Sequence, residues 1–206
     1  MDEIRELSDE VDTSSMLNLG ALLVPNIPGL EVHLDLDPRS GIGKSVSLHL
    51  NMTIAEVQVF ASASNEDHWA IMRDAIVAGL SEQQVDCSVE MGRFGTEIHA
   101  VMPTVDLDGN AHVQPVRFLG VRGTRWLVRV VISGDGALAN LNQSPSDVTE
   151  INNLIAQLVV HRGDEPLPPG ERLALRSPDM EADGDKASMK ANSGAESKFA
   201  NFQVRL

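Results

Sequence analysis

Cysteine and aromatic residues are scarce in this chain of 206 residues. Cys87 is the only cysteine, and the sequence has two tryptophans, five phenylalanines and no tyrosine. A single cysteine excludes an internal disulfide framework and a thiolate metal cluster. With 3% aromatic residues, the chain also lacks the rings that form a stacking platform for single-stranded nucleic acid. We therefore expect an aliphatic core and no nucleic-acid partner.

Long apolar runs and an excess of positive charge are also absent. No run approaches the roughly 18 apolar residues of a membrane span. Residues 1–12 (MDEIRELSDEVD) are acidic, the opposite of a secretory signal peptide. The formal net charge of -14 repels phosphate backbones and anionic lipid surfaces at long range. We expect a soluble cytoplasmic protein that binds no membrane.

Charge and composition divide the chain into three parts. Residues 1–16 are acidic and predict a disordered arm, and residues 17–176 have the composition of one globular domain. Residues 177–206 are rich in Asp, Ala, Ser, Gly and Lys and predict a disordered tail. This tail ends in KFANFQVRL, an apolar motif that either stays unstructured or docks on a partner or on its own domain. Its apolar residues are Phe199, Phe202, Val204 and Leu206.

Hydrophobic periodicity predicts the elements of the globular part. Alternation favours strands over 31–37, 44–50 and 55–63, followed by a helix that begins with Ser64 as its N-cap. Strands over 85–91, 96–105, 113–121 and 125–133 come next, and a second helix begins at Ser144-Pro145. Prolines at 166–169 end the domain, and residues 173–178 (LALRSP) are expected to trail along its surface.

This order of elements is typical of the α+β class. Three strands, a helix, roughly four strands and a second helix indicate an antiparallel sheet of about seven strands. Two main helices would pack on one face of it. The first helix presents an apolar stripe at helical spacing, consisting of Trp69, Met72, Ile76 and Leu80.

Two patterns of polar residues suggest chemistry that their context argues against. Gly41-Ile42-Gly43-Lys44-Ser45 resembles a phosphate loop, but Pro38 replaces the required glycine and the segment continues as a strand. A hairpin that turns near Gly41 places His33 opposite His49 with Asp35 nearby, which is either a metal site or a polar solvent face. No fourth ligand accompanies them, so we predict no metal.

Catalytic motifs are missing as well. Cys87 has no adjacent base, and no Gly-x-Ser-x-Gly elbow occurs. We predict no catalytic residue and no cofactor.

Four arginines within residues 117–129 form the strongest candidate for a binding surface. They are Arg117, Arg122, Arg125 and Arg129. Alternation places Arg125 and Arg129 on one face of their strand and Trp126 on the other. In the preceding strand, Arg117 and Phe118 likewise point to different faces. This pattern predicts a hairpin with one cationic outer face. Guanidinium groups bind carboxylate and phosphate in a forked geometry. The arginines either pair with this chain's own carboxylates or bind an acidic partner.

The leading functional hypothesis is a non-enzymatic interaction or adaptor module. Its arginine-bearing sheet face would hold an acidic segment of a protein partner, or a small anion. The alternative is an enzyme with an unrecognised pocket on the α+β domain. In a third interpretation, the acidic residues 1–16 cover the arginine face and inhibit binding.

Several segments of the sequence are similar to one protein family. GVRGTRWLVRVVISG, VVHRGDEPLPP, LGALLVPNIPGLEV and GRFGTEIHA, together with Trp69 and Arg73, resemble an uncharacterised actinobacterial family, domain-of-unknown-function family 3710. The resemblance extends from about Leu17 to Pro178 and implies no activity. The order of elements also resembles the PsbP/Mog1-type sandwich, a fold of non-catalytic assembly factors and adaptors.

Overall fold

A seven-stranded antiparallel sheet forms the centre of the molecule. The computed structural model describes residues 4–8, 10–105, 109–138 and 145–178. The strands lie in the order β4-β5-β6-β10-β9-β8-β7. Their bounds are β4 (Glu31–Leu36), β5 (Gly43–Leu50), β6 (Thr53–Ala61), β7 (Cys87–Gly92), β8 (Gly95–Val105), β9 (Ala111–Arg122) and β10 (Trp126–Gly134). The predicted α+β class with about seven antiparallel strands is confirmed.

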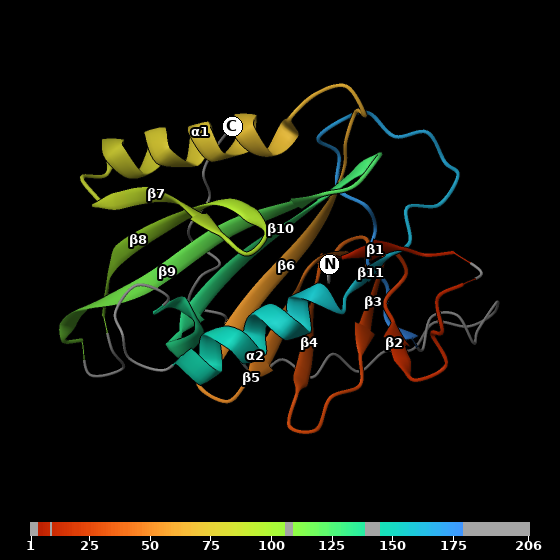
Figure 1. Ribbon diagram of the computed structural model, residues 1–206, viewed down its shortest axis with the longest axis horizontal. Helices are drawn as coiled ribbons and strands as arrows, with labels where there is room; N and C mark the ends of the chain where they lie inside the picture. Colours follow the sequence, from red (N-terminus) through yellow and green to blue (C-terminus); the bar gives the residue numbers. More distant parts are fainter. Residues whose placement is uncertain (1–3, 9, 106–108, 139–144, 179–206) are drawn as a thin grey trace.

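The two long helices cover opposite faces of this sheet. Figure 1 shows α1 (His68–Glu82) above the sheet and α2 (Pro145–Ala156) below it. On β10, Val128 and Val130 belong to the core cluster that contains α2 residues, whereas Leu127 belongs to the cluster under α1. The prediction that both helices pack on one face is therefore wrong, because β10 is apolar on both of its sides.

The first helix begins three residues later than predicted. Asp67, not Ser64, is its N-cap, and the Asp67 carboxylate accepts a hydrogen bond of 3.1 Å from the Ala70 backbone N–H. The predicted stripe faces the sheet, with Trp69, Ile76 and Leu80 buried and Met72 packed beside them.

Ser144, predicted before the second helix, lies outside the described residues. Among the described residues, no helix is long and apolar enough to cross a membrane.

The β4–β5 hairpin has a different register from the predicted one. Glu31, rather than His33, lies opposite His49, and His33 pairs with Ser47. The Asp37 carboxylate accepts hydrogen bonds from the backbone N–H groups of Arg39 and Ser40, so the turn is built around this residue. The ladder also shifts between Asp35 and Leu36.

A second, four-stranded sheet was not predicted. Its order is β1-β11-β3-β2, from β1 (Arg5–Glu6), β11 (Val159–Val160), β3 (Leu22–Pro25) and β2 (Met16–Asn18). It packs on the α2 side of the large sheet, because Leu22, Val24 and Val160 share the core cluster of α2. Residues of the predicted acidic arm take part in this sheet, and Ile4 is buried.

The segment after the prolines also belongs to the core. Leu173 and Leu175 are buried, and backbone bridges join Arg172 to Phe60 and Leu175 to Gly43. The prediction that this segment trails along the surface is wrong, because its alternate leucines, Leu173 and Leu175, belong to the main core cluster. Residues 179–206, most of the predicted disordered tail with its apolar motif, lie outside the described residues.

Replacement of Gly120 by alanine tests how α1 packs on the sheet. A methyl group on Gly120 would overlap the Trp69 indole, whose Nε1 donates a 2.7 Å hydrogen bond to the Thr96 carbonyl. We expect Gly120→Ala to lower the free energy of unfolding by about 1–3 kcal/mol through overpacking, measured by urea denaturation. Gln114→Ala, half-buried on the same strand, is the control. An unchanged urea midpoint for Gly120→Ala would contradict this packing.

Candidate functional site

The structure separates the arginines that we expected on a single face. In the β9–β10 ladder, Arg117 lies opposite Ile132, whereas Arg129 lies opposite Gly120. Ile132 belongs to the core cluster on the α2 side, so Arg117 points toward α2 and Arg129 toward α1. The prediction of one cationic outer face is wrong, because a one-residue difference in register moves a side chain to the other face of a sheet.

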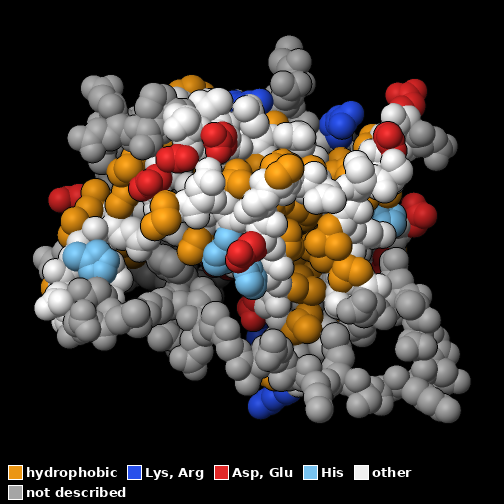
Figure 2. All heavy atoms as spheres, turned by 90° about the horizontal axis from the view of Figure 1, so that it is seen from below, with side chains coloured by type: hydrophobic (Ala, Val, Ile, Leu, Met, Phe, Trp, Pro, Cys, Tyr) orange, Lys and Arg blue, Asp and Glu red, His pale blue; other side chains and the backbone are white. Residues whose placement is uncertain are grey.

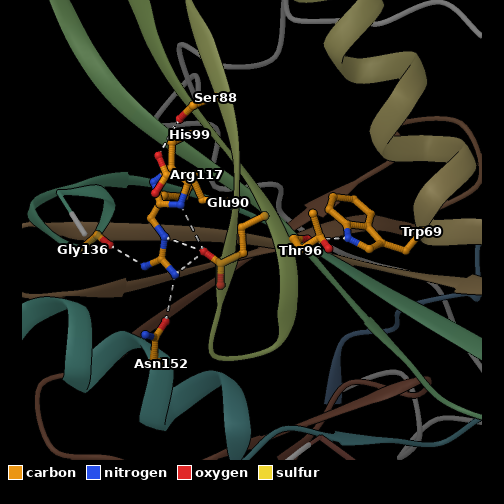
Figure 3. Close-up of polar contacts among 9 residues, drawn as sticks. Trp69, Ser88, Glu90, Thr96, His99, Arg117, Gly136 and Asn152 are labelled. Carbon is orange, nitrogen blue, oxygen red and sulfur yellow. Dashed lines mark hydrogen bonds and ion pairs between the residues drawn. The ribbon is translucent and has the colours of Figure 1, made fainter. Parts of the chain in front are cut away.

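Arg117 lies at the centre of a buried polar network (Figure 3). Its Nε and Nη2 donate hydrogen bonds of 3.1 and 2.7 Å to Glu97 Oε2. Its Nη1 donates to the Gly136 carbonyl at 3.0 Å, and its Nη2 lies 3.4 Å from Asn152 Oδ1 on α2. Only 2% of the Arg117 side chain and 1% of the Glu97 side chain are exposed. Each nitrogen of the Arg117 guanidinium group therefore has a hydrogen-bond partner inside the protein.

The network holds Glu97 in its charged form. Burial raises the pKa of Glu97, but hydrogen bonds and charge from His99 and Arg117 outweigh burial, and the net pKa is lowered from 4.5. His99 lies opposite Arg117 in the ladder, and its Nε2 is 3.6 Å from Glu97 Oε2. The other carboxylate oxygen of Glu97 has no hydrogen-bond partner and lies against Gly92, where any side chain would overlap it.

Arg129 has a very different environment from Arg117. Its Nη2 donates a 2.6 Å hydrogen bond to Gln58 Oε1, and its Cζ lies 5.6 Å from the centre of the Phe60 ring. Its Nη1 is 4.0 Å from the Met72 sulfur, and its buried Nε has no hydrogen-bond partner. Within the described part of the chain, no carboxylate lies within the 4.0 Å of an ion pair.

The charges around Arg129 leave its own charge only partly compensated. Burial lowers its pKa, the Glu56 carboxylate opposes this effect, and Arg172 adds to it. Gln58 separates Arg129 from Glu56, since its side-chain amide donates to Glu56 Oε1 at 3.3 Å. Arg172 is exposed and is joined to Phe60 by a backbone bridge. An oxyanion placed near these two guanidinium groups would be attracted by both.

The other two predicted arginines lie near the end of the same hairpin. Arg122 faces the α1 side with Arg129, since it pairs with Leu127, and its Nη1 lies 3.4 Å from the Asp67 carboxylate. Arg125 is exposed. The Arg125 carbonyl accepts hydrogen bonds from Arg162 Nε and from the Ser62 backbone N–H. Arg172 was not predicted to lie near Arg129, because its segment was expected to trail along the surface.

The histidines of the β4–β5 hairpin form a pair despite the shifted register. The ring centres of His33 and His49 are 4.6 Å apart, and His33 Nε2 lies 3.5 Å from the Glu31 carboxylate. Burial, followed by the charge of His33, lowers the pKa of His49. No group of three or more His, Cys, Asp or Glu side chains that could hold a metal occurs among the residues described.

Fold and site together define an α+β protein whose central hairpin carries a fully compensated Arg117 and a partly compensated Arg129. The chain belongs to a family described as proteins of unknown function, DUF3710, which matches residues 2–183. No curated protein matches it. A crystal structure from Bacteroides thetaiotaomicron VPI-5482 is similar, with 12% identity and a TM-score of 0.40 over 72% of this chain. This chain spans about half of that one, since the match covers 48% of it.

A double-mutant cycle tests the Glu97–Arg117 ion pair. Removal of one partner leaves a buried charge, so Arg117→Met and Glu97→Leu should each lower the free energy of unfolding by about 3–5 kcal/mol. The double variant Glu97→Leu/Arg117→Met should be more stable than the sum of the two losses implies. Urea denaturation of the four proteins measures this coupling. Strictly additive losses would show that the two side chains do not depend on each other.

The lowered pKa of Glu97 predicts how its contribution changes with pH. A carboxylate with a lowered folded-state pKa stabilises the protein fully above its unfolded pKa of 4.5 and loses this effect as the pH falls through the folded-state pKa. The stability difference between wild type and Glu97→Gln should therefore be constant near neutral pH and shrink below about pH 4.5. Glu82→Gln, exposed at the end of α1, is the control. A difference that grows in acid would contradict the ion pair.

Proposed function

We propose that this chain is a non-catalytic cytoplasmic binding module that recognises an acidic segment of a protein partner. Arg129 and Arg172 are its anion-binding residues, and Arg122 and Arg125 lie at the end of the same hairpin. One observation carries the proposal: the Arg129 guanidinium is largely withdrawn from water without a carboxylate within ion-pair distance in the described part of the chain. A partner carboxylate would supply the missing charge and acceptor.

The contrast with Arg117 supports this assignment. Arg117 is buried and Arg129 is half-buried, and the chain provides Glu97, Asn152 and Gly136 for Arg117. For Arg129 it provides only a neutral amide, an aromatic ring and a thioether. A charged group is costly to bury without a counter-charge. The Arg129 guanidinium, partly compensated in a chain of net charge -14, therefore supports a role in binding an anion rather than a role in stabilising the fold.

The enzyme alternative has less support from the geometry. An acid–base site needs a titratable group that reaches a substrate. Glu97 is 1% exposed and bound to Arg117. A groove beside β2 is lined by residues 14–17, 25–27, 30 and 32, and thus by none of Glu97, His99 and Arg129. The interpretation in which residues 1–16 inhibit the site also has less support, because Glu6 accepts a 3.1 Å hydrogen bond from Trp126 Nε1, on the side of the sheet opposite Arg129.

Titration with a hexaglutamate peptide tests the proposed site. We expect binding, measured by calorimetry at about 50 mM salt, to weaken steeply as the salt is raised to about 300 mM. Arg129→Gln and Arg172→Gln should each weaken it by roughly tenfold or more, because each removes a charged hydrogen-bond donor. Inorganic phosphate, titrated in parallel, should bind more weakly than the peptide.

Arg39→Gln is the matched control for this titration, since Arg39 is exposed in the β4–β5 turn. It should bind the peptide as wild type does. Arg172 is exposed, so Arg172→Gln should leave the fold intact even if Arg129→Gln is destabilised. Peptide binding that is unchanged in both arginine variants, or that is independent of salt, would overturn the proposal.

A further inference from the structure

An apolar groove lies at the end of the molecule where β2 approaches the turn between β3 and β4. It has a volume of about 530 Å³, within the roughly 300–1,000 Å³ of ligand-binding pockets. The turn between β3 and β4 lies at the lowest end of the molecule in Figure 1. Figure 2 views the molecule from that end and shows a band of hydrophobic side chains on its surface. The groove is lined by Ser14, Ser15, Met16, Leu17, Pro25, Asn26, Ile27, Leu30 and Val32.

The groove is suited to an extended apolar peptide. Leu17, Ile27 and Leu30 are only half-buried, although they pack against the main core. No described acidic or basic side chain lines the groove, and its polar groups come from two serines and an asparagine. β2 is the last strand of its sheet in the described structure, so its outer edge is available to pair with another extended segment.

The described chain ends beside this same strand. The Arg176 backbone N–H donates a 2.9 Å hydrogen bond to the Leu19 carbonyl, one residue beyond the end of β2. Leu175 forms a backbone bridge with Gly20. The described chain therefore ends close to the groove. Residues 179–198 number twenty, and a chain of that length with random-coil dimensions would span about 25 Å, which is enough for residues 199–206 to reach the groove at high effective concentration.

The last residues of the sequence match the groove in pattern and charge. Phe202, Val204 and Leu206 alternate with polar residues, so in an extended conformation they share one face. Arg205 and the preceding Lys198 give this end of the sequence a positive charge. Two exposed acidic residues, Asp12 and Glu31, adjoin the segments that line the groove. We propose that residues 199–206 occupy the groove of their own chain, as an extended segment along the edge of β2. This segment lies beyond residues 2–183, which match the family.

Disulfide trapping in the full chain tests this intramolecular contact. In a Cys87→Ala background, Ser15→Cys at the rim of the groove is combined with Gln203→Cys in the segment. Ser146→Cys, exposed at the start of α2, with Gln203→Cys is the control pair. With oxidised glutathione, the first pair should form an intramolecular disulfide at least about tenfold faster than the control pair, because docking raises the local thiol concentration. Non-reducing electrophoresis and mass spectrometry measure both rates.

A third protein separates specific docking from simple proximity. Phe202→Ser, Val204→Ser and Leu206→Ser, added to the Ser15→Cys/Gln203→Cys pair, keep the tether and remove the apolar face. The rate should then fall to that of the control pair. Equal rates for all pairs would overturn the proposal. A disulfide between two chains, formed at a rate that rises with protein concentration, would also overturn it and assign the groove to a second copy. Neither result bears on Arg129, whose test uses other residues.

Discussion

The hydrogen-bond register between β9 and β10 determines the environment of both arginines on which the functional argument rests. Arg117 pairs with Ile132 and Arg129 pairs with Gly120, so the two side chains leave the sheet on opposite faces. A slip of one residue would place Arg117 under α1, away from Glu97, Gly136 and Asn152. The position of Glu97 on the neighbouring strand β8 is fixed in the same way, by the pairing of His99 with Arg117.

The same register explains why two arginines of one hairpin have different environments. Burial of a charge costs several kcal/mol unless a counter-charge and hydrogen bonds compensate for it. Arg117 receives the counter-charge from Glu97, and it receives further hydrogen-bond acceptors from Gly136 in η1 (Asp135–Ala137) and from Asn152 on α2. Arg129 receives an amide acceptor and an aromatic face, which compensate less. The buried ion pair and the proposed anion site thus lie on opposite faces of the sheet.

The sequence predicts the strands well and their relative arrangement less well. Alternation along β4, β5 and β6 depends on local contrast between apolar and polar residues, and these strands are found close to their predicted bounds. Apart from Arg129, residues 126–132 on β10 are all apolar, which is typical of a strand buried on both faces, and this signal would have placed the helices on opposite sides. The cross-strand registers depend on turn geometry at Gly123–Arg125 and on Asp37, which periodicity does not reveal. The partner of Arg117 could not be predicted for the same reason.

The two proposed binding sites lie on opposite faces of the central sheet. Arg129 belongs to the α1 side with Phe60 and Met72, whereas Leu17, Ile27 and Leu30 of the groove pack against the core cluster on the α2 side. No residue lines both sites, and sites without shared partners act independently to a first approximation. A small domain with an anion site on one face and an apolar groove on the other can hold two different segments at once. A partner segment at the proposed anion site would therefore not compete with residues 199–206 in the groove, because the two occupants contact different residues.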